Sequence, residues 1–214
     1  MNRIMLFAGA SVFALTAVGA AAAGPPIGTF PGETPSRMKM LYNQNSDYAD
    51  ENVPSQESSL SEYTQGADDF VVPGHATWTI TEVDVSGQYY NGSGPASSED
   101  VIFYADSNGV PGDPVATFSN VKGTENDGSF SITLPGKGAK LKKGRYWVSV
   151  IANVSFVQGD GQWAWNVNSV LHGDEAVWRS PASQTCPNWG TLEACLDGTG
   201  PDLMFALMGT AKHE

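Results

Sequence analysis

The chain has 214 residues, and its 23 acidic residues against 11 basic ones give a formal net charge of −12 at pH 7. This acidity argues against nucleic-acid binding, because nucleic-acid binders present a basic face to the phosphates. It disfavours anionic membrane surfaces for the same reason. The length suits one domain with a large buried core.

The N-terminus, MNRIMLFAGASVFALTAVGAAAAG, predicts a secretory signal peptide over residues 1–23. A basic start at Arg3 precedes an apolar stretch over residues 4–18, and an Ala-x-Ala ending follows at residues 21–23. The apolar stretch is shorter than the roughly 18 residues expected of a membrane span, and no later segment reaches that length. We therefore expect an exported protein without a membrane span, either extracellular or periplasmic.

Residues 24–37, GPPIGTFPGETPSR, predict a flexible lead, and we expect the domain over residues 38–211. Residues 38–66 are polar and acidic with few branched apolar side chains, so composition alone favours a disordered arm there. Only the family resemblance described below implies that this part is folded.

From residue 68 onward the sequence predicts strands. Short apolar stretches rich in β-branched and aromatic residues are bounded by Gly, Asn, Asp and Pro, and no sustained helical repeat of apolar residues occurs. The expected strands are 68–72, 77–90, 100–105, 114–121, 129–134, 144–153, 162–168, 175–180 and 202–210. Their spacing, with turn residues between them, predicts an all-β protein built as an antiparallel β-sandwich of jelly-roll type.

The long expected strand 77–90 has an irregular pattern. Its apolar residues before Glu82 are out of phase with those after it. We therefore expect either a β-bulge near Glu82 or a strand that is covered on both faces.

The stretch ADSNGVPGDPV (105–115) has two interpretations. Asp106, Asn108 and Asp113 carry oxygens of the kind that calcium binds, on a loop that glycine allows to curl. However, Asn-Gly is a strong hairpin dipeptide, and Pro-Gly suits the centre of a type II turn. We favour a plain turn and keep calcium as the alternative, since the stretch lacks the spacing and terminal Glu of a helix-loop-helix calcium site.

The segment GKGAKLKKGR (136–145) concentrates basic residues: Lys137, Lys140, Lys142, Lys143 and Arg145. We interpret it as a solvated loop before the next strand. A docking patch for an acidic polymer is the alternative.

Cys186 and Cys195 are the only cysteines. An exported chain meets oxidising conditions in which such a pair normally forms a disulfide. The chain-entropy model values this small loop at roughly 2.7 kcal/mol. A zinc site is disfavoured, because it needs about four ligands and the chain has only 3 histidines to add.

Aromatic residues are the candidates for ligand binding. Flat rings stack against sugar faces, but a sandwich also needs large rings in its core, and core packing is the simpler interpretation of any single Trp. Trp163 and Trp165 share one face of their strand, because they are two residues apart. The residues expected to line a ligand surface are Trp147, Trp163, Trp165, Trp189, Tyr89 and Tyr90.

Catalytic candidates are few. Glu82 and Asp84 share a strand face, a pairing found in two-carboxylate glycosidases, but Ser86 stands where a third carboxylate would lie. His172 is the better histidine for a Ser-His-Asp triad, although no G-x-S-x-G motif occurs. An ordinary half-exposed strand also explains the acidic pair. We therefore favour a protein without catalysis and keep Glu82, Asp84 and His172 as the residues to test.

Eight motifs follow one another along the chain: LYNQ (41–44), SQ (55–56), GADDFVVP (66–73), WTITEVDVSG (78–87), VIFYADSNGVPGDPV (101–115), GRYWVSV (144–150), QWAWN (162–166) and DLMFALMGT (202–210). Together they resemble bacterial secreted jelly-roll-like domains that occur alone or attached to surface proteins and exported proteases. The resemblance implies that LYNQ is a first strand and not a tail. The group shares no common activity that could be transferred.

These patterns predict a secreted, non-catalytic β-sandwich that binds a carbohydrate or another extracellular surface ligand, with structural calcium as an option. The partner would be an extracellular glycan or a surface protein. One alternative is a secreted hydrolase or lyase acting on a polysaccharide or a protein. The other is a structural protein of an envelope or matrix.

Overall fold

The computed structural model describes residues 38–58, 63–155, 158–197 and 199–213. The predicted signal peptide (1–23) and lead (24–37) lie outside these residues. Within the described ranges, no helix has the length and apolarity needed to cross a membrane.

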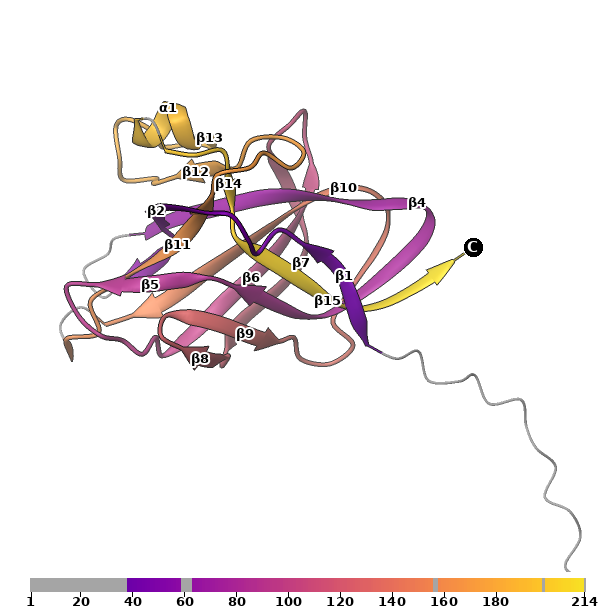
Figure 1. Cartoon of the computed structure of the whole chain (residues 1–214), viewed down its shortest axis with the longest axis horizontal. Coiled ribbons are helices and arrows are strands. Elements are labelled where there is room, and N and C mark those ends of the chain that lie inside the picture. The colour runs from indigo at the N-terminus through magenta and orange to yellow at the C-terminus, as the bar shows by residue number, and fades with distance from the viewer. Residues whose placement is uncertain (1–37, 59–62, 156–157, 198, 214) are drawn as a thin grey trace, which may run out of the picture. The chain divides into compact units, whose positions relative to one another are not determined.

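The domain is an antiparallel β-sandwich, as the sequence predicts (Figure 1). The strands of the larger sheet lie in the order β1 (Lys39–Asn43), β15 (Phe205–His213), β4 (Tyr63–Val85), β3 (Gln56–Ser58), β10 (Ala139–Val154), β6 (Ser98–Asp106) and β7 (Pro111–Val121). Attached to it are β8 (Thr124–Asn126), β9 (Ser129–Thr133), β12 (Val177–Arg179) and β13 (Gly190–Thr191). One pairing, between β10 and β3, is parallel.

The smaller sheet is built around β11 (Gln162–Asn168). One edge of β11 pairs with β2 (Tyr48–Pro54), and the other edge pairs with β5 (Gly87–Tyr90) and β14 (Asp202–Leu203). The observed limits of β11 are those expected from its sequence.

The expected strand 77–90 is two strands. A bulge in the pairing with β15 falls between Ile80 and Glu82, so the predicted irregularity near Glu82 is confirmed. The chain then leaves the larger sheet at Ser86 and enters the smaller one as β5. The bulge restores the inward direction of the apolar side chains, because Trp78, Ile80, Val83 and Val85 are all buried.

Large side chains from both sheets fill the space between them. Trp163 and Trp165 of β11 contact Phe130 of β9 and Phe205 of β15, with ring centroids 5.1 Å and 6.4 Å apart. Burying each such ring stabilises the folded state by roughly 1.5–3 kcal/mol relative to leaving it exposed to solvent.

Residues 38–58 form β1, β2 and β3, as the family resemblance implies and although their composition alone favours a disordered arm, because they pair with strands supplied by distant parts of the chain. One expectation about the chain is wrong. The segment 139–145 is not a solvated loop, because it is the first part of β10 and pairs with β4.

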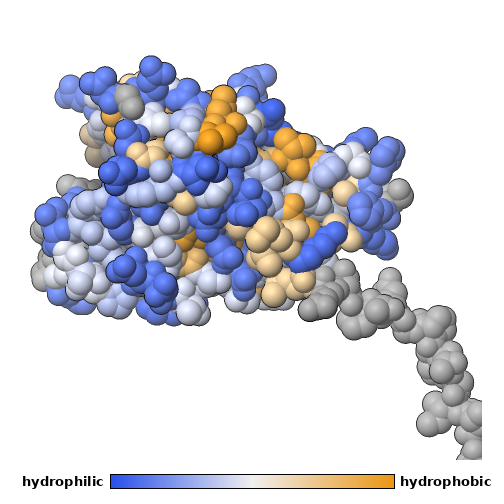
Figure 2. Space-filling view, in the orientation of Figure 1, coloured by the Kyte–Doolittle hydropathy of each residue, from blue (hydrophilic) through white to orange (hydrophobic). Residues whose placement is uncertain are grey.

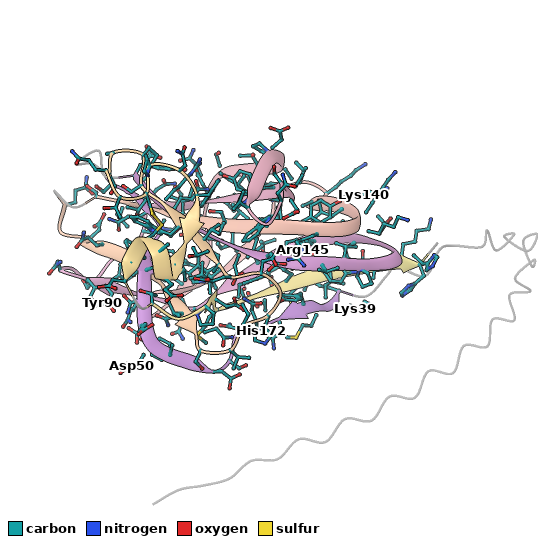
Figure 3. The ribbon with its side chains drawn as sticks, turned by 90° about the horizontal axis from the view of Figure 1, so that it is seen from above. Lys39, Asp50, Tyr90, Lys140, Arg145 and His172 are labelled. Atoms are coloured by element: carbon teal, nitrogen blue, oxygen red, sulfur yellow. A yellow bond between two sulfur atoms is a disulfide. The ribbon has the colours of Figure 1, made fainter. Side chains whose placement is uncertain are left out.

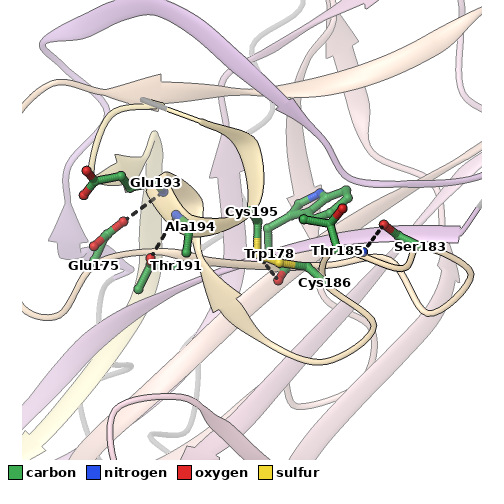
Figure 4. Close-up of a disulfide and its surroundings, with 9 residues drawn as sticks. All are labelled: Glu175, Trp178, Ser183, Thr185, Cys186, Thr191, Glu193, Ala194 and Cys195. Carbon is green, nitrogen blue, oxygen red and sulfur yellow. Dashed lines mark hydrogen bonds between the residues drawn. A yellow bond between two sulfur atoms is a disulfide. The ribbon is translucent and has the colours of Figure 1, made fainter.

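The predicted disulfide between Cys186 and Cys195 is present (Figure 4). The short helix α1 (Leu192–Leu196) begins inside the bridged loop. No helix was expected here from the sequence. Thr191 caps this helix by accepting a hydrogen bond from the backbone of Ala194 at 3.3 Å. The disulfide therefore fixes a small loop that contains β13, which pairs with β12.

Candidate functional site

Three of the predicted ligand-binding indoles belong to the core. Trp147, Trp163 and Trp165 have exposed fractions of 0%. Their indole Nε1 atoms donate hydrogen bonds to Asp106 Oδ1 (2.9 Å), Gly128 O (2.7 Å) and Met204 O (2.8 Å). The prediction that these three rings line a ligand surface is wrong, because all three side chains are buried, although the residue Trp163 borders one of the hollows described below.

The other predicted aromatics differ in exposure. Trp189 is half-buried, and the guanidinium of Arg179 lies 4.4 Å from its ring centroid. The hydroxyl of Tyr89 donates to Glu125 at 2.9 Å and accepts from the backbone of Ala96 at 2.8 Å. Both rings are thus engaged within the protein. Tyr90 is 39% exposed and remains available to a ligand.

The outer face of the smaller sheet collects uncharged polar side chains around Tyr90. Because Trp163 and Trp165 point inward, their neighbours in β11 point outward, and directly paired residues share that face. Gln162 is paired with Tyr90 of β5, and Asn166 is paired with Asn52 of β2. We call this surface the amide-tyrosine face and define it as Tyr48, Asn52, Gln88, Tyr90, Gln162 and Asn166.

Hydrogen bonds between side chains hold the amide-tyrosine face in place. Gln88 Nε2 donates to the hydroxyl of Tyr48 at 3.0 Å, and Asn52 Nδ2 donates to the hydroxyl of Tyr90. Asn91 Nδ2 donates to Gln162 Oε1 at 2.9 Å. These bonds involve the nitrogen of the Gln88 amide and the oxygen of the Gln162 amide. The other atom of each amide, Gln88 Oε1 and Gln162 Nε2, has no hydrogen-bond partner in the described part of the chain. The face therefore offers oriented donors and acceptors to a ligand.

A groove continues from the amide-tyrosine face. Its first hollow, of about 200 Å³, is lined by Asn52, Pro54, Tyr90, Gln162, Trp163 and Ala164. Pro54 and Gln162 also line a second hollow of about 430 Å³, which reaches Trp178 and Tyr63. The two hollows are neighbours, because Pro54 and Gln162 line both of them.

The surface around these features is mainly hydrophilic. Figure 2 shows hydrophobic residues as small separate patches on the side in view. The exposed large apolar and tyrosine side chains are Met38, Met40, Tyr48, Val71, Tyr90, Val115, Val170 and Leu171. The view shows no broad apolar area of the kind that marks an apolar docking surface.

The two carboxylates proposed for catalysis lie half-buried on the outer face of β4. Glu82 Oε2 accepts a hydrogen bond from Thr133 at 3.4 Å. Asp84 lines a hollow of about 310 Å³ with Asn45 and Asn126, to which Glu82 does not contribute. The pair therefore does not face one shared cavity, as carboxylates on both sides of a scissile bond would.

His172 meets a buried carboxylate. Its Nδ1 atom lies 3.3 Å from Asp202 Oδ2, and its backbone N–H donates to the same oxygen. In the described ranges, no serine or cysteine side chain is hydrogen-bonded to this imidazole. His172 and Asp202 are thus placed as the histidine and acid of a triad would be, but no nucleophile among the described residues is hydrogen-bonded to the histidine.

Asp202 belongs to a buried aspartate cluster, which we define as Asp68, Asp69 and Asp202, all at most 1% exposed. Asp68 Oδ2 accepts hydrogen bonds from Gln44 Nε2 at 2.6 Å and from the backbone of Leu203 at 2.7 Å. Asp69 Oδ2 lies 3.1 Å from Arg145 Nη1. The cluster links β4 of the larger sheet to β14 of the smaller one.

Burial raises the pKa values of these three carboxyl groups. Loss of solvent raises the pKa of Asp202 to about 6 and that of Asp69 to about 6. The pKa of Asp68 is raised well above its ordinary value by burial and by the nearby charge of Asp202. Their environment is that of structural groups that join two sheets.

The three residues proposed for calcium lie in or next to the turn between β6 and β7. Asn108 and Gly109 have positive φ angles of 57° and 81°, as a type I′ hairpin turn requires. Asp106 Oδ1 accepts from Trp147 Nε1 and from the backbone of Gly109 at 3.3 Å. Asp113 is exposed on β7. Across the described residues, no three Asp, Glu, His or Cys side chains are placed to hold a metal ion.

We expect the melting temperature of the protein to be the same in millimolar calcium and in excess chelator. The physical reason is that Asp106 Oδ1 already accepts from two N–H groups, and no three Asp, Glu, His or Cys side chains of the described residues are placed to hold a metal ion. Differential scanning calorimetry under both conditions checks this. A clear upward shift with calcium would mean that the ion binds the folded state at a site formed elsewhere.

Sequence reasoning missed most of the amide-tyrosine face. Tyr48 and Asn52 lie in the part whose composition favours disorder, and Gln88 has no distinctive motif. Gln162 and Asn166 were detectable, because they alternate with Trp163 and Trp165 in QWAWN and must face the opposite way.

No family model matches the sequence, and no curated protein matches it. One solved structure has a similar backbone arrangement over part of its length. It contains the cysteine protease and lectin-like domains of Cwp84, a surface layer associated protein of Clostridium difficile. The TM-score is 0.48 and the sequence identity is 10%, with 71% of this chain and 32% of that chain covered. The present chain thus matches about a third of the length of that protein.

Proposed function

We propose that this domain binds neutral carbohydrate without catalysis, through the amide-tyrosine face and its groove. The observation that carries the proposal is the grouping of Tyr48 and Tyr90, 43% and 39% exposed, with four primary amides on one sheet face. The signal peptide predicted from the sequence would bring this face to glycans outside the cytoplasm.

The chemistry of the face matches that of a sugar. A sugar ring has an apolar C–H face and a rim of hydroxyl groups that both donate and accept hydrogen bonds. Tyrosine rings provide an apolar surface with a polar edge. The amide atoms without a partner in the described structure, Gln88 Oε1 as an acceptor and Gln162 Nε2 as a donor, can bond sugar hydroxyls.

The lack of charge favours a neutral ligand. None of the six side chains of the amide-tyrosine face is ionised, and the charge that acts on Tyr90 is that of acidic Asp50, in a protein whose net charge is −12. An anionic ligand would find no cation on the face to offset its desolvation. The groove of adjoining 200 Å³ and 430 Å³ hollows can take a ligand longer than one sugar, because the hollows share Pro54 and Gln162.

We expect the double substitution Tyr48→Ala/Tyr90→Ala to weaken binding to neutral oligosaccharides at least roughly tenfold, which corresponds to about 1.4 kcal/mol. A glycan array identifies the ligand, and isothermal titration with that oligosaccharide measures the affinity. Val115→Ala is the matched control, because Val115 is 46% exposed on β7 and lies outside the face and groove.

The array would contradict the proposal if neutral glycans failed to bind the wild-type protein, or if the double variant bound them as well as the control. The non-catalytic part is checked by incubating the bound oligosaccharide with wild-type protein and analysing its length. Shortened products that disappear with Glu82→Gln would instead support the hydrolase alternative.

A further inference from the structure

Lysines from two distant segments meet on the outer face of the larger sheet. Thr77 of β4 is paired with Lys142 of β10 on one side and with Lys212 of β15 on the other. Two residues along, Thr79 is paired with Lys140 and with Thr210 in the same way. Directly paired residues share a face, so the six side chains lie on one face of the sheet, where Thr77 is buried between the lysines. We call it the lysine-threonine face and define it as Thr77, Thr79, Lys140, Lys142, Thr210 and Lys212.

The lysines of this face are free to bind an external anion. Lys140, Lys142 and Lys212 are exposed, and none of them forms an ion pair or a hydrogen bond within the described residues. His75 and Lys143 lie beside them and line a hollow of about 120 Å³ with Thr77 and Lys142. Figure 3 shows Lys140 at the opposite end of the domain from Tyr90, so this face is separate from the amide-tyrosine face.

We propose that the lysine-threonine face binds an acidic polysaccharide. The complementarity is electrostatic: the exposed ammonium groups of Lys140, Lys142 and Lys212 match the carboxylate, sulfate or phosphate oxygens of such a polymer. The Debye length is about 8 Å at physiological salt, so the local positive charge acts on a bound polymer although the whole protein is acidic.

The spread of the lysines favours a polymer over a small anion. Neighbouring strands are about 4.8 Å apart, which places the backbones of Lys142 and Lys212 about 10 Å from each other across β4. A small anion would reach one ammonium group in water, where a single exposed ion pair contributes little. A polymer with regularly spaced charges contacts several lysines at once, and its linked contacts add.

Other anionic partners fit less well. Duplex DNA carries one charge per about 1.7 Å of its axis, so the acidic remainder of the domain would repel it more strongly than a polysaccharide with one charge per sugar ring. A membrane-binding face normally adds apolar side chains that enter the lipid, whereas this face places threonines between its lysines.

The test uses the triple substitution K140Q/K142Q/K212Q and its charge-conserving counterpart K140R/K142R/K212R. Binding is measured by biolayer interferometry to immobilised polygalacturonate, dextran sulfate and uncharged dextran, in about 0.1 M and about 1 M salt, between which the Debye length falls from about 10 Å to about 3 Å. We expect wild type to bind at least one acidic polymer at low salt. We expect the Gln variant to bind at least roughly tenfold more weakly and the Arg variant to bind as wild type does.

Each outcome decides the question. Equal binding by the Gln variant and the wild type would overturn the proposal, as would preference for uncharged dextran or binding to anionic vesicles but to neither acidic polysaccharide. The two acidic polymers separate carboxylate from sulfate recognition. Tyr48→Ala/Tyr90→Ala should keep full affinity for the acidic polymer, so failure of the proposed neutral-glycan function would not affect this result.

Discussion

Replacing Trp165 with alanine is expected to lower the free energy of unfolding by about 3–5 kcal/mol, the range for removing a buried aromatic side chain. The Trp165 ring centroid lies 6.3 Å from that of Trp163 and 6.4 Å from that of Phe205, so its removal leaves a cavity between the sheets. The substitution also leaves the carbonyl of Met204 without its indole donor. Urea denaturation followed by circular dichroism measures the loss.

Tyr90→Ala is the comparison for this experiment, because Tyr90 belongs to the same sheet but lies on its outer face. We expect it to change the free energy of unfolding by less than about 1 kcal/mol while weakening neutral-glycan binding. The opposite result, a stable Trp165→Ala protein that no longer binds glycan, would show that the indoles and not the amide-tyrosine face bind the ligand.

The strands were predictable where their pattern is local. In QWAWN the alternation shows correctly that Trp163 and Trp165 share a face. The pattern does not say which face is covered, because aromatic rings suit both a core and a sugar-binding surface. That choice depends on the larger sheet packing against β11, which is a contact between distant parts of the chain.

The N-terminal strands were hidden by their polar composition. β2 lies at an edge of the smaller sheet and β1 at an edge of the larger one, so both have much exposed surface and need few apolar residues. Their stability comes from pairing with β11 and β15, which no local pattern reveals. The start of β10 is similar: Lys140 and Lys142 suggest a solvated loop, but Ala139 and Leu141 alternate with them and are buried.

The motifs that carry the family resemblance supply buried polar connectors. Gln44 of LYNQ donates to Asp68 of GADDFVVP, and Asp68 accepts from Leu203 of DLMFALMGT. Composition treats these residues as surface groups, but Gln44 is 1% and Asp68 is 0% exposed. A buried polar group is tolerated when hydrogen bonds satisfy it, and those partners become known only from the fold.

The buried aspartate cluster leads to the second large effect, a dependence of stability on pH. A carboxyl whose pKa is raised on folding holds its proton more tightly in the folded state than in the unfolded one. Its stabilising contribution is complete below the unfolded pKa of 3.8 and is lost as the pH rises through the folded pKa, which is about 6 for Asp69 and for Asp202. We therefore expect the free energy of unfolding to be higher near pH 5 than at pH 8, as measured by urea denaturation.

Asp202→Asn should stabilise the protein at pH 8 and have little effect near pH 3, which lies below both the unfolded pKa of 3.8 and the folded pKa of about 6. A shift from 3.8 to about 6 corresponds to a gain on the order of 3 kcal/mol at pH 8. The amide oxygen can still accept from the backbone of His172, and the nitrogen replaces Oδ1, which accepts no hydrogen bond in the described structure, so no existing hydrogen bond is lost. Asp113→Asn removes the same charge from an exposed position and separates the local effect from that of net charge. If Asp202→Asn instead destabilised the protein equally at both pH values, the ionised carboxylate would be a required partner of His172 rather than a buried charge that opposes folding.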